Sequence, residues 1–150
     1  MTTETEVKQA SDQFYAALNQ MLATGDARAV TAVWSQGQAG STMHPIGGRE
    51  IGRDQVTATW NQAGPAFSEG RASSDDVAVI PLCDDVAYTV GTERFEGKVG
   101  GEMVRGEWRV TNIYRREDGG WKIVHHHADA SPEVTEVLAR LQAQAGQTTG

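Results

Sequence analysis

The second half of the chain has a two-residue periodicity, and this constrains the fold more than any other feature. Branched and aromatic residues alternate with polar ones, which predicts strands over residues 71–82, 85–96, 102–116 and 121–128. The connections are rich in Asp and Gly and short enough for antiparallel hairpins: residues 83–84, 97–101 and 117–120. We therefore expect a four-stranded antiparallel meander.

The first half of the chain follows helical spacing instead. Apolar residues at helical intervals predict a helix over residues 5–23, and Asp26 is placed to cap a second one. A short strand is expected from Ser41 to His44, because Pro45 and the glycines after it stop the chain. The glycine-rich segment 47–52 lacks phosphate-loop spacing, so we expect a turn there that leads into a helix over residues 52–63.

The C-terminal segment predicts one more helix. Ser131 is a capping residue, Pro132 suits the first helical position, and the tail after about residue 145 is expected to be disordered.

Helices followed by a meander predict an α+β fold: a cone-shaped single domain over residues 1–150, with a curved antiparallel sheet wrapped around the N-terminal helices. Such a sheet encloses a conical pocket.

Composition excludes several classes of partner. The net charge of −7 does not suit a phosphate backbone, so nucleic acid is not expected. No apolar run approaches membrane-spanning length, and the polar, acidic first residues are not a secretory signal, which makes the cytoplasm the default location. Cys83 is the single cysteine and precedes two aspartates, a poor setting for a reactive thiolate.

The last predicted strand carries three consecutive histidines. If the strand is regular, His125 and His127 share a face with Trp121 and Ile123, and His126 lies on the other face. One β-bulge would exchange these assignments.

The order of elements, together with several motifs, resembles the nuclear transport factor 2-like superfamily, most closely its SnoaL-like and ketosteroid-isomerase-like bacterial members. The motifs are Phe14-Tyr15-Ala16-Ala17-Leu18-Asn19 with Gly25-Asp26, Met43-His44-Pro45 with Gly52-Arg53, and the run from Tyr114 to His125. The resemblance implies the α+β cone. It leaves the function open, because this fold serves isomerases, dehydratases, cyclases, epoxide hydrolases and assembly domains.

The resemblance also suggests roles for single residues. His44 stands where ketosteroid isomerases have a base aspartate, before a Pro-x-Gly turn. Phe14 matches the oxyanion tyrosine, with Tyr15 one position on, and Thr111 matches the second oxyanion donor. The donors that stabilise an enolate are therefore lost or weakened, so we do not expect a true ketosteroid isomerase.

His44 is the best catalytic candidate, because a histidine titrates near neutral pH; a hydrogen-bonded rim residue is the alternative. His125 or His127 would be its partner or anchor the substrate. The three together could instead bind a metal, a lesser alternative, and we expect neither a metal nor another cofactor.

Several residues could contact a ligand. Trp60, Tyr88 and Trp108 could line an apolar pocket. Arg94 could hold an anionic substrate, although an ion pair on the outer sheet face, with Glu93, Glu107 and Arg109 nearby, is favoured.

Two functions remain open from sequence. The first is a cofactor-free acid/base enzyme, an isomerase, dehydratase or cyclase, acting on a mostly apolar small molecule. The second is a non-catalytic ligand-binding or assembly domain. In both cases the outer sheet face is expected to form a homodimer.

Overall fold

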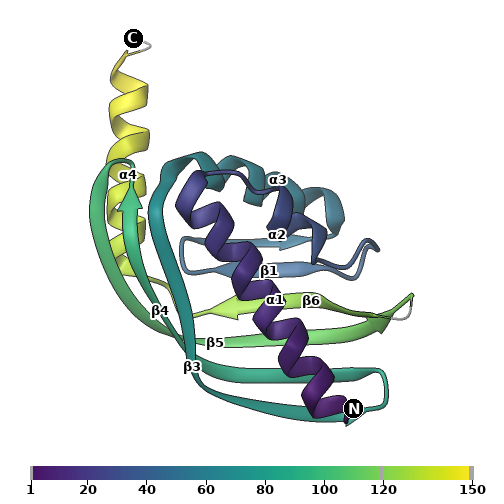
Figure 1. The fold of residues 1–150 in the computed structure, drawn as a ribbon. Helices are drawn as coiled ribbons and strands as arrows, with labels where there is room; N and C mark the ends of the chain where they lie inside the picture. Colours follow the sequence, from purple (N-terminus) through teal and green to yellow (C-terminus); the bar gives the residue numbers. More distant parts are fainter. Residues whose placement is uncertain (1, 119, 149–150) are drawn as a thin grey trace.

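A six-stranded sheet, with strand order β2-β1-β6-β5-β4-β3, curves around the first helix (Figure 1). The computed structural model describes residues 2–118 and 120–148. The helices are α1 (Thr3–Thr24), α2 (Arg28–Ala32), α3 (Arg53–Ala63), the 3-10 turn η1 (Gly64–Ala66) and α4 (Pro132–Thr148). The strands are β1 (Ser41–His44), β2 (Gly47–Ile51), β3 (Phe67–Cys83), β4 (Val86–Val99), β5 (Glu102–Glu117) and β6 (Gly120–Ala128). This confirms the predicted α+β cone.

Helix α1 crosses the concave face of the sheet and supplies much of the core (Figure 1). Thr2 caps its start by accepting a hydrogen bond from the Thr5 backbone N–H at 3.2 Å. Gly25 ends it in the left-handed conformation, with φ of 80°, and donates its N–H to the Met21 carbonyl at 2.7 Å. Between these ends, the buried apolar residues of α1, from Val7 to Leu22, pack against the sheet and α2.

The predicted meander is β3 to β6, with β3 beginning earlier than expected, at Phe67. The prediction for residues 47–51 was wrong: they form β2, which pairs antiparallel with β1. Gly47 and Gly48, with φ of 93° and 84°, let the chain reverse tightly after β1. The β1–β2 hairpin joins the sheet because β1 pairs in parallel with β6, with Thr42 opposite His126.

Strand β6 contains a bulge at Val124. Ile113 of β5 pairs with His125, but the next residue, Tyr114, pairs with Ile123, so Val124 has no partner position. The bulge shifts the alternation by one residue, so Ile123, His126 and Ala128 are the buried side chains of β6.

Helix α4 begins where the sequence predicts, with the Ser131 hydroxyl accepting from the Val134 N–H at 3.3 Å. It packs against β4 and β5 through Val134 and Val137. The helix continues to Thr148; the rest of the tail for which disorder is predicted, residues 149–150, lies outside the described residues.

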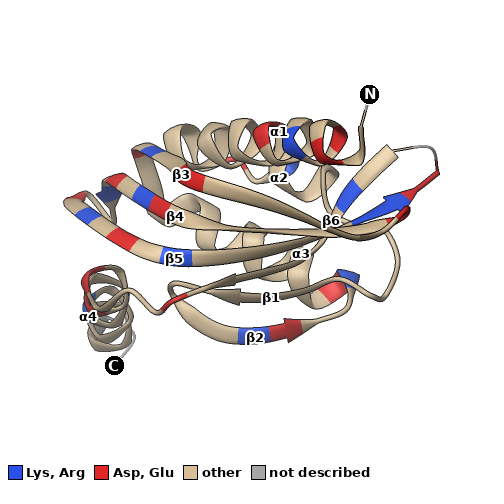
Figure 2. Cartoon of the chain, turned by 90° about the horizontal axis from the view of Figure 1, so that it is seen from below, with Lys and Arg blue, Asp and Glu red and all other residues tan. Residues whose placement is uncertain are grey.

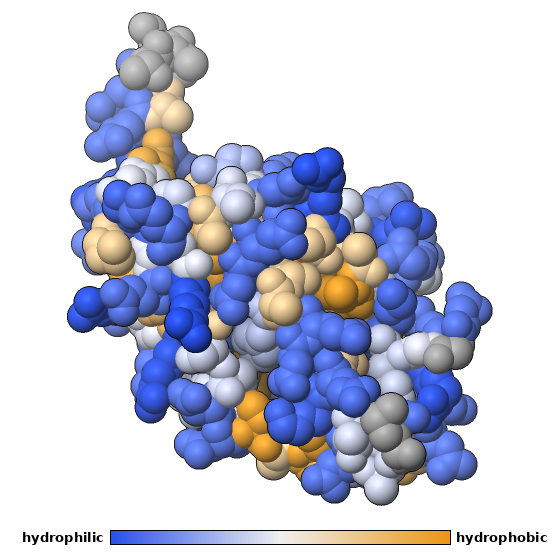
Figure 3. Space-filling view, viewed as in Figure 1, coloured by the Kyte–Doolittle hydropathy of each residue, from blue (hydrophilic) through white to orange (hydrophobic). Residues whose placement is uncertain are grey.

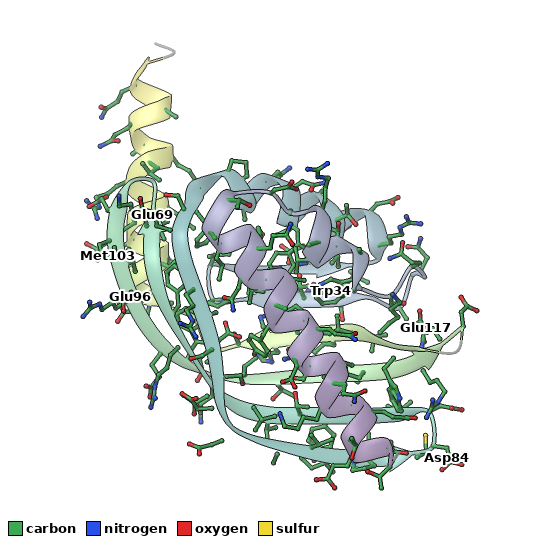
Figure 4. All side chains as sticks on the ribbon, viewed as in Figure 1. Trp34, Glu69, Asp84, Glu96, Met103 and Glu117 are labelled. Carbon is green, nitrogen blue, oxygen red and sulfur yellow. The ribbon has the colours of Figure 1, made fainter. Side chains whose placement is uncertain are left out.

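The surface on the α1 side is mostly hydrophilic, with small separate apolar areas (Figure 3). The side chain of Trp34 (Figure 4) is instead only 3% exposed, and its ring centroid lies 6.4 Å from that of Trp60 on α3. None of the helices in the described part of the chain has an apolar stretch of membrane-spanning length.

Candidate functional site

A cavity lies inside the cone, between the second half of α1, α3, the concave sheet face and the start of α4. It offers about 60 Å³ to the centre of a water-sized sphere and about 570 Å³ of empty space, counting its mouth. A single water molecule needs about 10–15 Å³ of the volume that is open to sphere centres. The cavity therefore has room for a small ligand. The lining residues are Leu18, Met21, Leu22, His44, Pro45, Ile46, Thr59, Trp60, Ala63, Phe67, Ala72, Glu93, Phe95, Trp108, His126 and Val134. The walls are mainly apolar, and the ionisable side chains among them are His44, Glu93 and His126.

His44 ends β1, where Pro45 terminates the strand, and its side chain points inward beside Trp60. The two rings meet edge to face, with centroids 4.6 Å apart. The side chain is buried, which lowers the pKa of His44 to about 4, so the imidazole is neutral at pH 7. Its Nε2 atom is also buried and has no hydrogen-bond partner among residues 2–118 and 120–148. The structure thus places the predicted candidate in a cavity, with a ring nitrogen available to a ligand.

His126 is the second imidazole of the cavity, with its ring centroid 5.7 Å from that of His44. Its Nδ1 lies 2.6 Å from the side-chain oxygen of Asn112. A carbonyl oxygen only accepts, so Nδ1 carries the proton and Nε2 holds the lone pair. Burial keeps the pKa of His126 well below its ordinary range, so this ring is neutral too.

The expected placement of His125 and His127 was wrong, because the Val124 bulge exchanges the faces of the strand after Ile123. Both rings lie on the convex face, with centroids 6.1 Å apart. His125 contacts the Ser41 hydroxyl through Nδ1 at 2.7 Å. The sequence does carry a signal for His126: the pattern Ile123, His126, Ala128 is the inward pattern that one bulge produces.

This separation also bears on the metal alternative. His44 lies on the concave face and the His125–His127 pair on the convex face, so the three do not form one site. Among the described residues, no group of three or more His, Cys, Asp or Glu is arranged to hold a metal ion.

Glu93 is a buried carboxyl that the sequence analysis placed in an outer-face cluster. Only 3% of it is exposed, and it lines the cavity from β4. The Tyr15 hydroxyl donates to one oxygen at 2.7 Å, and the Trp108 indole N–H donates to the other at 2.9 Å. Burial raises the pKa of Glu93. The two hydrogen bonds lower it, but burial is the larger effect. The missed signal is alternation, because Glu93 is two residues from the buried Phe95 and therefore shares its face.

The predicted ligand-contacting residues divide between the two faces. Trp60 and Trp108 line the cavity as expected. Tyr15 does not line the cavity but donates its hydroxyl to Glu93, and burial raises the pKa of that hydroxyl. Phe14 is fully buried behind the cavity, where its ring lies 5.6 Å from that of His126.

Tyr88, Arg94 and Thr111 lie on the convex face, so their predicted contact with a ligand in the cone was wrong. Each alternates with buried residues of its strand. Arg94 forms salt bridges with Glu107 at 2.7 Å and with Asp75 at 3.0 Å. This is the ion pair on the outer face that the sequence favoured over a substrate contact. Mixed charges run along this end of β3, β4 and β5 (Figure 2). Asn112, next to Thr111, is one of the buried, inward-pointing residues of β5.

Comparison with known proteins yields one family. The family model described as SnoaL-like domain matches residues 7–131, most of the chain. A search of the curated proteins finds no match.

Solved structures with the same fold cover most of the chain. One is named as a candidate dehydratase of the NTF2-like family from Streptomyces avermitilis; it is 25% identical, with a TM-score of 0.74, over 85% of this chain and 95% of that chain. Another, from Thiobacillus denitrificans, is named as a candidate calcium/calmodulin-dependent protein kinase type II association domain; it is 29% identical, with a TM-score of 0.64, over 83% and 94% of the two chains. A ketosteroid isomerase-like protein from Erwinia carotovora is 16% identical, with a TM-score of 0.70 over 86% and 97%, and shows the fold alone.

Proposed function

This chain belongs to the SnoaL-like domain family, as its resemblance implied, and we propose that it is a cofactor-free enzyme in which His44 transfers a proton on a small, mostly apolar molecule. The observation that carries this proposal is the buried, unpartnered Nε2 of a neutral His44 in an apolar cavity. Unsatisfied buried polar atoms are rare in folded proteins, and a ligand that fills the cavity would satisfy this one.

A neutral imidazole in this setting is a base. Nε2 would accept a proton from an acidified C–H of the ligand, and the resulting imidazolium, with a pKa of about 4, would be a stronger acid than an ordinary imidazolium. It would return the proton to another carbon, which is isomerisation, or to a departing hydroxyl, which is dehydration. One residue can therefore serve both halves of either reaction.

His126 would assist from the neighbouring strand. Asn112 holds its tautomer, so the lone pair of Nε2 can accept a hydrogen bond from a ligand hydroxyl. This role replaces the one predicted for His125 and His127. The Streptomyces relative named as a candidate dehydratase supports the dehydratase form of the proposal.

Assembly without catalysis is the second candidate, favoured by the relative named as a candidate association domain. A domain that only assembles has no need for a cavity with two neutral imidazoles. The cavity therefore favours the enzyme.

Hydrogen exchange tests the proposal without knowledge of the natural substrate. Cyclohexanone and cyclohex-2-enone have acidified C–H groups and fit a small apolar cavity. In D₂O, we expect the wild-type protein to accelerate their deuterium uptake, followed by NMR, and His44→Gln to lower the rate on the order of a hundredfold, as for a positioned general base.

The matched control is His127→Gln, which removes an exposed imidazole from the convex face and should exchange as the wild type does. Equal rates for wild type and His44→Gln, with both proteins folded by circular dichroism, would reject His44 as the base.

A further inference from the structure

Glu93 is a buried carboxyl without a cationic partner. Both of its hydrogen bonds come from neutral donors, Tyr15 and Trp108, and no salt bridge to it is present in the described part of the chain. The neighbouring Arg94 points to the convex face, where Glu107 and Asp75 hold it. The lining of the cavity contains neither Lys nor Arg.

An uncompensated buried carboxylate is costly, by several kcal/mol. The cost is avoided by a proton, which the raised pKa of Glu93 favours, or by a cation that enters with a ligand. The indole of Trp108 can only donate and the Tyr15 hydroxyl also donates here, so both oxygens are oriented as acceptors. That arrangement suits the ionised form.

Aromatic rings surround the same space. Trp60, Phe67, Phe95 and Trp108 line the cavity with Glu93. Phe95 stacks on Trp108 with centroids 6.3 Å apart, and Phe67 meets Phe95 edge to face at 5.8 Å. The faces of such rings attract a desolvated cation, and the attraction is strongest for indole.

We propose that the ligand of this cavity is a small organic ammonium compound, whose positive charge lies against Glu93 among the aromatic rings. Its apolar remainder would contact the aliphatic side of the cavity, formed by Leu18, Met21 and Leu22 of α1, within reach of His44. An anionic ligand would lie beside Glu93 with no Lys or Arg to pair with it among the described residues that line the cavity, so the lining favours a cation. This inference rests on the proposed function only in taking the cavity as the ligand site.

Choline and 3,3-dimethylbutan-1-ol test the inference, because they have nearly the same shape and differ by the positive charge. In calorimetric titrations of the wild-type protein at pH 8, we expect choline to bind at least tenfold more tightly. Glu93→Gln should abolish this preference and leave binding of the neutral alcohol unchanged. Glu107→Gln removes a carboxylate from the convex face and should keep the preference, which controls for net charge.

Equal or tighter binding of the neutral alcohol would overturn the inference and leave the proposed ligand site intact. Binding of neither compound would also overturn it. The wild-type comparison needs no variant, so it decides the matter even where Glu93→Gln is unstable. Deuterium exchange tests His44 separately, so the failure of either proposal can be recognised.

Discussion

His44 and His126 meet inside the cone with ring centroids 5.7 Å apart, although they come from distant parts of the chain. The contact exists because β1 pairs in parallel with β6, and because His44 and His126 both point to the concave face. Two neutral imidazoles thereby share one cavity with the carboxyl of Glu93.

Burial of His44 predicts a specific loss of stability in acid. Its pKa is lowered from an ordinary 6.5 to about 4, so the unfolded chain takes up a proton first as the pH falls. The contribution of the neutral, buried His44 to the free energy of unfolding is fully present above pH 6.5. About 3 kcal/mol of it is lost as the pH falls from 6.5 to 4. Glu93, with its raised pKa, acts in the opposite sense.

A comparison of wild type with His44→Gln isolates this contribution, because Glu93 and His126 remain in both proteins. Urea denaturation at pH 7 and pH 4 should show the wild type losing about 3 kcal/mol more than the variant. Parallel losses in the two proteins would contradict the burial of His44.

Asn112 is expected to determine the tautomer of His126. Its side-chain oxygen accepts from Nδ1 at 2.6 Å, so nitrogen NMR of the wild type should report a neutral ring protonated at Nδ1. Asn112→Ala should lower the free energy of unfolding by about 1–3 kcal/mol, because it leaves a buried N–H unpaired, and should allow the other tautomer. An Nε2-protonated ring in the wild type would disprove the assignment.

Tyr15→Phe should destabilise the fold by about 1–3 kcal/mol, since it removes a hydrogen bond to the buried Glu93. Tyr88→Phe is the matched control, because Tyr88 lies half-buried on the convex face. Its effect should stay within about 0.5 kcal/mol in urea denaturation. Similar effects of the two substitutions would show that the Tyr15 hydroxyl contributes little.

The convex sheet face is expected to form a homodimer through a symmetric sheet-to-sheet contact. Val90 is 39% exposed there and lines a groove with Thr111 and His127. Sedimentation at micromolar concentration should give a mass twice the 16.1 kDa of the chain. Val90→Glu should shift it toward the monomer, and a monomeric wild type would contradict the expectation.

Much of the fold follows from local patterns in the sequence. The helical stripe of α1, the alternation in β3 to β5 and the Ser131-Pro132 helix start each predict their element, because periodicity reports directly which side chains can be buried together. The position of His44 before Pro45 also follows from sequence, since proline ends the strand.

The chemical content of the cavity was decided by tertiary structure. The unpaired Val124 in β6 brings His126 inward instead of His125 and His127. The sequence pattern is compatible with a regular and with a bulged strand, so the pairing with β5 decides between them. Glu93 is buried because Tyr15 of α1 and Trp108 of β5 both donate to it, and these partners become neighbours only when α1 packs on the sheet. Sequence alone determined the long helices and the meander, whereas strand β2, the parallel pairing of β1 with β6, the register of β6 and the burial of polar groups depended on contacts between distant segments.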